Sequence, residues 1–142
     1  MISMRYIFFD TSVVLDYILH GKKYEISRRQ MSNLDSGDQQ GILDSVALLE
    51  IKYHLIRHIG HDKAEEAILF LKNRKNFSVV PVTEDIAERA ANLRIKYFNR
   101  DKSPISTADA IHIATALEHQ CKKIITADSD FKVVSEIETE VY

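Results

Sequence analysis

Residues 5–19 of the 142-residue chain read RYIFFDTSVVLDYIL, and their pattern is the clearest indication of the fold class. Arg5 to Phe9 is short, aromatic and β-branched, which is typical of a buried strand. Asp10-Thr11-Ser12 then offers side chains that favour a helix start, and Val13 to Leu19 has the pattern of a helix. The stretch therefore predicts an apolar strand that passes directly into a helix, with an acidic residue at the junction.

The rest of the chain continues this alternation of strands and helices. Further strands are expected at Gln40–Leu43, at Phe77–Val82, at Lys123–Thr126 and, as a last short strand, within Val133–Val141. Further helices are expected at Tyr24–Leu34, Val46–Ile59, Lys63–Lys72, Glu84–Tyr97 and from Ser106 or Thr107 to about Glu118. Asp44-Ser45 is expected to cap the helix Val46–Ile59, and residues 99–104 are expected to form a polar loop. Alternation of this kind predicts an α/β fold with a parallel sheet covered by helices on both faces.

The composition is that of one ordinary globular domain over residues 1–142, with 45% hydrophobic and 28% charged residues. The single Cys121 excludes an internal disulfide and suits a reducing compartment. Neither a signal peptide nor a membrane span is recognisable, so we expect a cytoplasmic protein with no membrane partner. The net charge of −2 makes no global case for nucleic-acid binding, although bound cations would reverse the local sign at an acidic site.

Four acidic residues stand where an α/β chain places catalytic groups. Asp10 ends an apolar run, Asp128 closely follows the apolar pair Ile124-Ile125, and Glu50 and Asp109 lie near the starts of two helical patterns. Sites in parallel sheets form beyond the carboxyl ends of the strands. Carboxylates in apolar surroundings are costly to bury unless a positive charge pairs with them. A shared site for divalent cations explains all four, and it predicts a metal-dependent enzyme.

Each of these acids also has a purely structural interpretation. Asp10 has the position of a cap for the first helix, and Asp109 that of the last member of a capping box begun by Ser106. Asp128 suits an Asx turn, and Glu50 is an ordinary acid of a first helical turn. These interpretations stay open for each residue alone, but they do not explain why all four match one ordered pattern.

That pattern extends over nearly the whole chain as four separate motifs. The motifs are Phe8–Leu15 (FFDTSVVL), Asp44–Glu50 (DSVALLE), Thr107–Ala116 (TADAIHIATA) and Ile124–Phe131 (IITADSDF). In order and spacing they resemble the motifs of the PIN-domain nucleases. The resemblance implies a three-layer α/β/α fold with a central, mostly parallel sheet, and RNA cleavage that depends on Mg²⁺ or Mn²⁺. The chain is most similar in size to the VapC-type toxins of VapBC toxin–antitoxin pairs, which implies an antitoxin partner and a homodimer.

The chemistry assigns unequal roles to the acids. Oxygen ligands suit Mg²⁺ and Mn²⁺, which are expected to activate a water and to stabilise the attacking and leaving oxygens of a phosphodiester. Asp10 and Asp109 are the expected central ligands, with Asp128 in support directly or through water. Glu50 is expected to orient a water or to bind a second ion. Three further side chains are expected to assist them: Ser12, Thr126 and Asp130.

Two histidine patterns compete with this interpretation. Glu50, His54 and His58 repeat at intervals of four residues, as zinc ligands on one helix face can, but the bare spacing is common and a solvated face is the better interpretation. His112 lies one turn after Asp109 and resembles a general base. Its apolar neighbours favour a packed, structural histidine.

Other functions remain open beside the nuclease toxin. An RNA-processing nuclease without a toxic role would use the same residues. A receiver-like phosphoacceptor also uses an acidic pocket and Mg²⁺, but Asp10 has no acidic neighbour upstream and Lys123 precedes its strand instead of following it. A catalytically silent binding module is the third alternative, and the intact set of acids argues against it.

Overall fold

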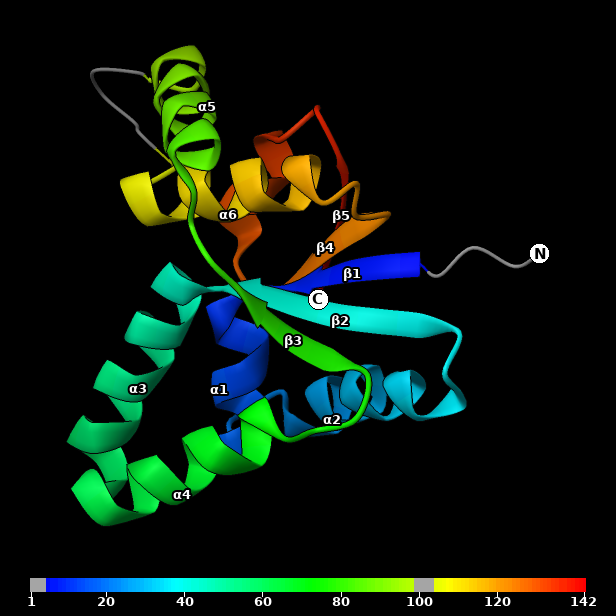
Figure 1. Cartoon of the computed structure of the whole chain (residues 1–142), viewed down its shortest axis with the longest axis vertical. Helices are drawn as coiled ribbons and strands as arrows, with labels where there is room; N and C mark the ends of the chain where they lie inside the picture. Colours follow the sequence, from blue (N-terminus) through cyan, green and yellow to red (C-terminus); the bar gives the residue numbers. More distant parts are fainter. Residues whose placement is uncertain (1–4, 99–103) are drawn as a thin grey trace.

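A computed structural model describes residues 5–98 and 104–142 (Figure 1). The strands are β1 (Arg5–Phe9), β2 (Gln39–Asp44), β3 (Phe77–Val80), β4 (Lys123–Thr126) and β5 (Glu138–Val141). The helices are α1 (Thr11–Leu19), α2 (Tyr24–Ser32), α3 (Ser45–Ile59), α4 (His61–Lys72), α5 (Glu84–Lys96) and α6 (Thr107–Glu118), with 3₁₀ turns at Asn33–Ser36 and Ser129–Val133. In the part of the chain so described, every helix is too short or too polar to cross a membrane.

The five strands form one sheet in the order β3-β2-β1-β4-β5, and every described pair is parallel. The chain runs outward from β1 through β2 to β3, and then returns to build β4 and β5 on the other side of β1. The direction of winding therefore changes between β1 and β4, which is where such sheets form their sites. The expected parallel sheet and the last short strand are confirmed.

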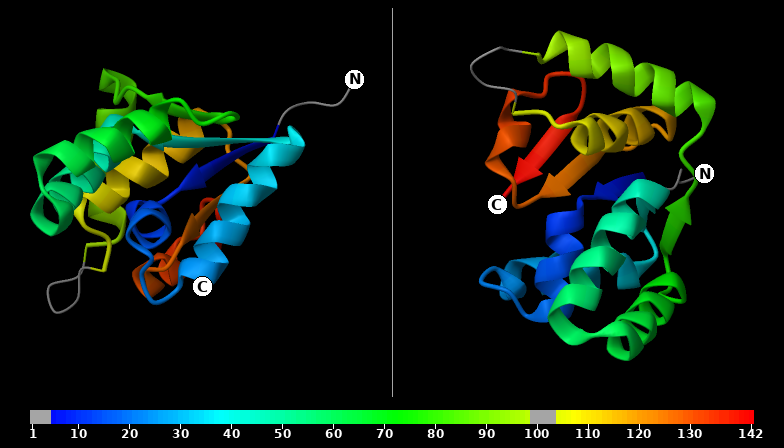
Figure 2. Two further views of the ribbon diagram at one scale, coloured as in Figure 1. Left: turned by 90° about the horizontal axis from the view of Figure 1, so that it is seen from below. Right: turned by 90° about the vertical axis from the view of Figure 1, so that its left-hand side faces the viewer.

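Helices cover both faces of this sheet, which confirms the three-layer fold (Figures 1 and 2). Ile7 and Phe9 of β1 face a core formed with α1 to α4, whereas Phe8 between them faces a core formed with α5 and α6. This alternation follows from the two-residue period of a strand. Because both faces are buried, β1 is apolar throughout its buried half, as the sequence predicted.

Several element boundaries differ from those expected, each for a local reason. β3 ends at Val80 and not at Val82, because Pro81 has no N–H to continue the ladder. The second helix stops at Ser32 and passes into a 3₁₀ turn that ends at Gly37, whose φ of 83° is left-handed. β2 runs on to Asp44, which places this acid at the carboxyl edge of the sheet. The polar loop expected at residues 99–104 lies outside the described residues except for Pro104.

Candidate active site

Asp10 is the first residue after β1 and is 5% exposed. It occupies the position before α1, but its side chain makes no capping hydrogen bond to that helix. Oδ2 instead accepts hydrogen bonds from the hydroxyls of Ser12 and Thr126, both at 2.8 Å. The carboxylate is therefore tied to the end of β4, and the capping interpretation does not hold for it.

The turn after β4 places Asp128 on the other side of the same threonine. Thr126 accepts the backbone N–H of Asp128 at 2.9 Å, and Asp128 Oδ1 accepts the backbone N–H of Asp130 at 2.9 Å. The Asx-turn geometry considered for Asp128 is thus present. Ser12 accepts the backbone N–H of Ala127 at 3.0 Å, so the two auxiliary hydroxyls join the ends of β1 and β4. Asp130 is exposed, and it joins the turn through its backbone alone among the described hydrogen bonds.

Asp109 reaches the site from the first turn of α6. It forms the capping box expected with Ser106: its backbone N–H donates to the Ser106 hydroxyl at 3.1 Å, and Oδ2 lies 3.4 Å from the backbone nitrogen of Ser106. Burial and the negative charge of Asp10 raise the pKa of Asp109 to about 6. The charges of the two acids expected as central ligands therefore act on each other.

Glu50 comes from the second turn of α3 and has a different environment. Its Oε1 accepts the hydroxyl of Thr11 at 2.9 Å and lies 2.8 Å from Nε2 of His112. Burial alone would raise the pKa of Glu50, but the hydrogen bond and the positive charge of His112 outweigh it, so the pKa lies below its usual value. Glu50 is thus ionised, and its hydrogen bond to Thr11 places it beside the residue that follows Asp10.

A buried pair that the sequence did not identify as part of a site stands behind Glu50. Nδ1 of His112 lies 2.9 and 3.1 Å from the two carboxylate oxygens of Asp44, and both residues are 0% exposed. Burial would lower the pKa of His112, but its bonds to Asp44 and Glu50 raise it to about 10. His112 is packed, as predicted, and Asp44 caps α3 as predicted. Their contact joins positions 68 residues apart, and no local pattern signals it.

The four acids share one feature that fits a hard cation. In each, the hydrogen bonds within the described chain reach a single oxygen: Oδ2 of Asp10 and Asp109, Oδ1 of Asp128 and Oε1 of Glu50. The second oxygen of each carboxylate receives none from a described residue. Within residues 5–98 and 104–142, however, no three His, Cys, Asp or Glu side chains are grouped closely enough to hold a metal ion. Mg²⁺ commonly takes one or two protein carboxylates and keeps several waters, so the pair Asp10 and Asp109 suffices for it.

The competing zinc pattern on α3 is not a site in the structure. His54 and His58 are exposed, and Nδ1 of His58 lies 2.7 Å from the backbone oxygen of His54. No metal-binding group of three occurs in the described ranges. The interpretation as a solvated helix face is therefore confirmed.

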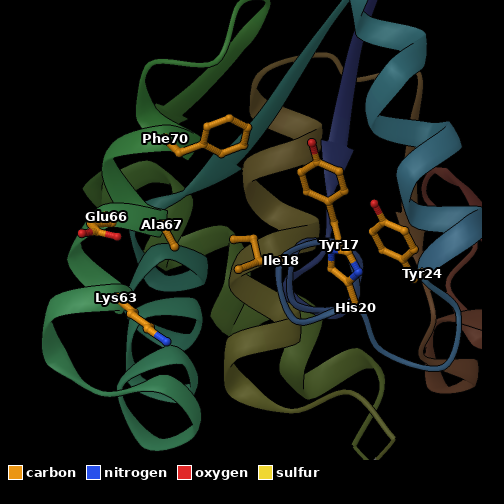
Figure 3. Close-up of a pocket in the computed structure, with 8 residues that line it drawn as sticks. All are labelled: Tyr17, Ile18, His20, Tyr24, Lys63, Glu66, Ala67 and Phe70. Carbon is orange, nitrogen blue, oxygen red and sulfur yellow. The ribbon is translucent and has the colours of Figure 1, made fainter.

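Two grooves lie beside α1. The groove next to the acids is lined by Ser12, Leu15, Asp16, Lys22, Lys23 and Ala127, and so shares Ser12 and Ala127 with the site. The second, of about 470 Å³, lies between α1, α2 and α4 at the far end of α1 (Figure 3). There the rings of Tyr17, His20 and Tyr24 stand opposite Phe70 of α4, and His20 stacks on Tyr24 with 3.9 Å between ring centroids.

The fold and the acids at its switch point define an α/β protein with a carboxylate-lined edge, and comparison with known proteins narrows this class. Residues 7–137 match the family model described as PIN domain. The chain belongs to the PIN domain family. A comparison with curated proteins gives no significant match.

Three solved structures of similar fold are distant in sequence from this chain. VapBC2 from Rickettsia felis, bound to a DNA fragment from its promoter, has a TM-score of 0.77 at 13% identity, with 96% of this chain and 98% of that chain covered. DNA-bound VapBC from Salmonella typhimurium has a TM-score of 0.76 at 16% identity, with 98% of each chain covered. VapC20 from Mycobacterium tuberculosis, a Sarcin–Ricin loop cleaving toxin, has a TM-score of 0.66 at 21% identity, with 83% and 86% covered. These likenesses establish the fold.

Proposed function

We propose that this PIN domain is a metal-dependent endoribonuclease that acts as the toxin of a toxin–antitoxin pair. The observation that carries the proposal is the arrangement of Asp10 and Asp109. Both carboxylates lie at the carboxyl edge of the sheet, their charges act on each other, and each has one oxygen that no described residue engages. Two acids whose negative charges act on each other are costly without a cation to neutralise them.

In this proposal Asp10 and Asp109 hold Mg²⁺ or Mn²⁺, and Asp128 supports them directly or through water. When bound, such an ion would supply Lewis acidity and would offset the charge of the phosphate. The hydroxyls of Ser12 and Thr126 hold Oδ2 of Asp10, so Oδ1 keeps a fixed direction. Glu50 accepts a hydrogen bond from the attacking water and orients it toward phosphorus. Asp130 has a minor role, since its backbone shapes the turn of Asp128.

The proposed substrate is RNA, and the proposed partner is an antitoxin. They are supported by the similar fold of VapC20, a Sarcin–Ricin loop cleaving toxin, and by that of VapBC proteins from two other bacteria. The antitoxin is expected to place a segment over the acids and to neutralise them with an Arg or Lys. An RNA-processing nuclease is the alternative. Growth arrest on expression, relieved by the product of an adjacent small gene, separates the two.

A homodimer is also part of the proposal. The groove between α5 and α6 has about 480 Å³ and is lined mostly by small and apolar side chains, including Ala87, Ala91 and Ile111. Ile95 at its edge is 76% exposed. A surface of this kind on a small domain is a candidate for contact with a second copy. Light scattering after gel filtration, on the wild type and on Ile95→Glu, tests this directly.

The test of the enzymatic proposal is RNA cleavage with and without Mn²⁺, comparing the wild type with Asp10→Asn. The variant is isosteric, and it is expected to lose cleavage and most of the metal-induced rise in melting temperature while it remains folded. Asp62→Asn, an exposed position on α4, is the matched control and is expected to behave as the wild type. Cleavage by folded Asp10→Asn at the wild-type rate would overturn the assignment.

A further inference from the structure

The buried contacts of Asp44 use its whole hydrogen-bonding capacity. Oδ1 accepts the backbone N–H of Ala47 at 2.8 Å, and Oδ2 accepts the hydroxyl of Thr115 at 2.8 Å. Both oxygens also contact Nδ1 of His112. The carboxylate is therefore fixed by β2, α3 and α6 together, and it fixes the plane and direction of the histidine ring.

The ring in turn points its other nitrogen at Glu50. Nε2 lies 2.8 Å from Glu50 Oε1. An ionised carboxylate can only accept hydrogen bonds, so a ring held between Asp44 and Glu50 donates from both nitrogens. A charge-assisted bond of this kind is stronger than a neutral one and orients its partner more sharply.

Of the three linked side chains, Asp44, His112 and Glu50, only that of Glu50 reaches the surface. Its side chain is 32% exposed, against 1% for His112 and 0% for Asp44. A half-exposed glutamate on a helix ordinarily samples several rotamers. Here Oε1 receives donors from two directions, Thr11 of α1 and His112 of α6, whereas Oε2 receives none from a described residue. The result is a partly exposed carboxylate with one oxygen held by two donors and one oxygen that accepts no hydrogen bond from a described residue.

Stability alone does not account for this arrangement. Buried ion pairs contribute little net stability, because the desolvation of the charges offsets their attraction, and well-packed apolar residues do as well. A histidine between two carboxylates, itself fully buried with its ring close to that of Phe8, is costly as a packing element. What an apolar residue could not do is hold Glu50 in one orientation.

We propose that Asp44 and His112 are positioning residues, which hold the Oε1 atom of Glu50 so that Oε2 faces the acidic site. The inference rests on the proposed nuclease function for its catalytic meaning. Neither residue touches the reacting atoms, and both act through Glu50. Groups that orient a metal or water ligand from behind commonly contribute about 10- to 100-fold to activity or metal affinity.

A double-mutant cycle tests whether His112 acts through Glu50. Cleavage rates and the KM for RNA are measured for the wild type, His112→Gln, Glu50→Ala and the double variant. We expect His112→Gln to lower kcat by about 10- to 100-fold with KM changed by less than about threefold. In the Glu50→Ala background the same substitution is expected to have no further effect. An equal loss in both backgrounds, or no loss in the wild-type background, would overturn the proposal.

A second measurement does not require activity or a folded variant of His112. Nitrogen-15 NMR of the wild type is expected to show protons on both ring nitrogens of His112. Glu50→Gln is expected to shift the Nε2–H signal and to leave Nδ1–H near its place. A ring with one proton, or signals that ignore Glu50→Gln, would overturn the proposal. His58→Gln, an exposed histidine on α3, is the control and is expected to leave rates and spectra unchanged.

The same assays separate this inference from the function on which it rests. If the wild type shows no metal-dependent cleavage, the proposed function fails, and the NMR spectra still decide whether His112 holds Glu50. If the wild type cleaves RNA and Asp10→Asn does not, but the cycle is additive, only the positioning role fails. Calorimetric titration with Mn²⁺ completes the comparison, because His112→Gln is expected to change the affinity less than Asp10→Asn does.

Discussion

The hydroxyl of Thr126 lies 2.8 Å from Oδ2 of Asp10, although 116 residues separate the two in the chain. The hydroxyl oxygen of Thr126 also accepts the backbone N–H of Asp128 at 2.9 Å. One side chain at the end of β4 thus sets the direction of an acid after β1 and the turn of an acid after β4. The switch point of the sheet is held together by this contact.

Thr126→Val therefore has a specific expected effect. Valine preserves the shape but removes the donor to Asp10 and the acceptor of Asp128. We expect a loss of about 1–3 kcal/mol in the free energy of unfolding, because the N–H of a partly buried residue loses its partner. Cleavage is expected to fall further than stability alone explains. Urea unfolding and cleavage assays measure the two effects, and Thr139→Val on β5 is the matched control. Unchanged cleavage in Thr126→Val would contradict the role given to this hydroxyl.

The pKa of Asp109 predicts a pH dependence of the metal-free protein. The folded state raises this pKa to about 6. Between about pH 4 and 6, the Asp109 carboxyl is therefore mostly protonated in the native protein and mostly ionised in the unfolded chain. The resulting stabilisation is complete below the unfolded pKa and is lost as pH rises through about 6. Asp109→Asn removes this dependence, so we expect it to raise the melting temperature more at pH 7.5 than at pH 4.5. An equal effect of Asp109→Asn at the two pH values would count against the raised pKa.

Metal binding is expected to show the opposite trend. A cation requires the ionised carboxylate, so the proton on Asp109 competes with it at low pH. We expect Mn²⁺ to bind roughly tenfold more weakly at pH 5 than at pH 7.5, since most Asp109 side chains are protonated one unit below a pKa of about 6. Calorimetric titration at the two pH values measures this. Equal affinities would mean that Asp109 is not a ligand.

The positions of the acids could be predicted from the sequence because two short-range patterns agree there. Asp10 and Asp128 each follow an apolar strand, and parallel strands bring their carboxyl ends to one edge. Local patterns also predicted that Asp44 caps a helix and that His112 is packed. They could not predict that these two side chains meet, since the contact depends on how α6 crosses the end of β2. The failure of Asp10 to cap α1 has the same origin, because the competing donor Thr126 lies on another strand.

Gly41 is a second residue whose role could not be predicted from the sequence. Its segment has only a weak strand pattern, and the close packing around it is the reason for a glycine there. A β-carbon there would lie 2.8 Å from the ring of Phe77 and 2.9 Å from Cδ1 of Leu34. Gly41→Ala is therefore expected to lower the free energy of unfolding by about 1–3 kcal/mol through overpacking. Gly37→Asn is the control, because asparagine tolerates a left-handed backbone and no atom lies within 4 Å of the added β-carbon. Equal stability of Gly41→Ala and the wild type would show that the core adapts.

Lys22 lines the groove beside the acids. Lys23 next to it donates to the backbone oxygen of Tyr142 at 2.7 Å, but Lys22 has no partner within the described ranges. A lysine on the wall of a groove that shares Ser12 with the site is placed to contact an RNA phosphate. Lys22→Glu is expected to weaken RNA binding and to reduce the salt dependence of that binding by about one phosphate contact, with the fold unchanged. Lys75→Glu, which precedes β3 at the opposite edge of the sheet, is expected to have little effect. If both variants weaken binding equally, the groove has no special part in holding the substrate.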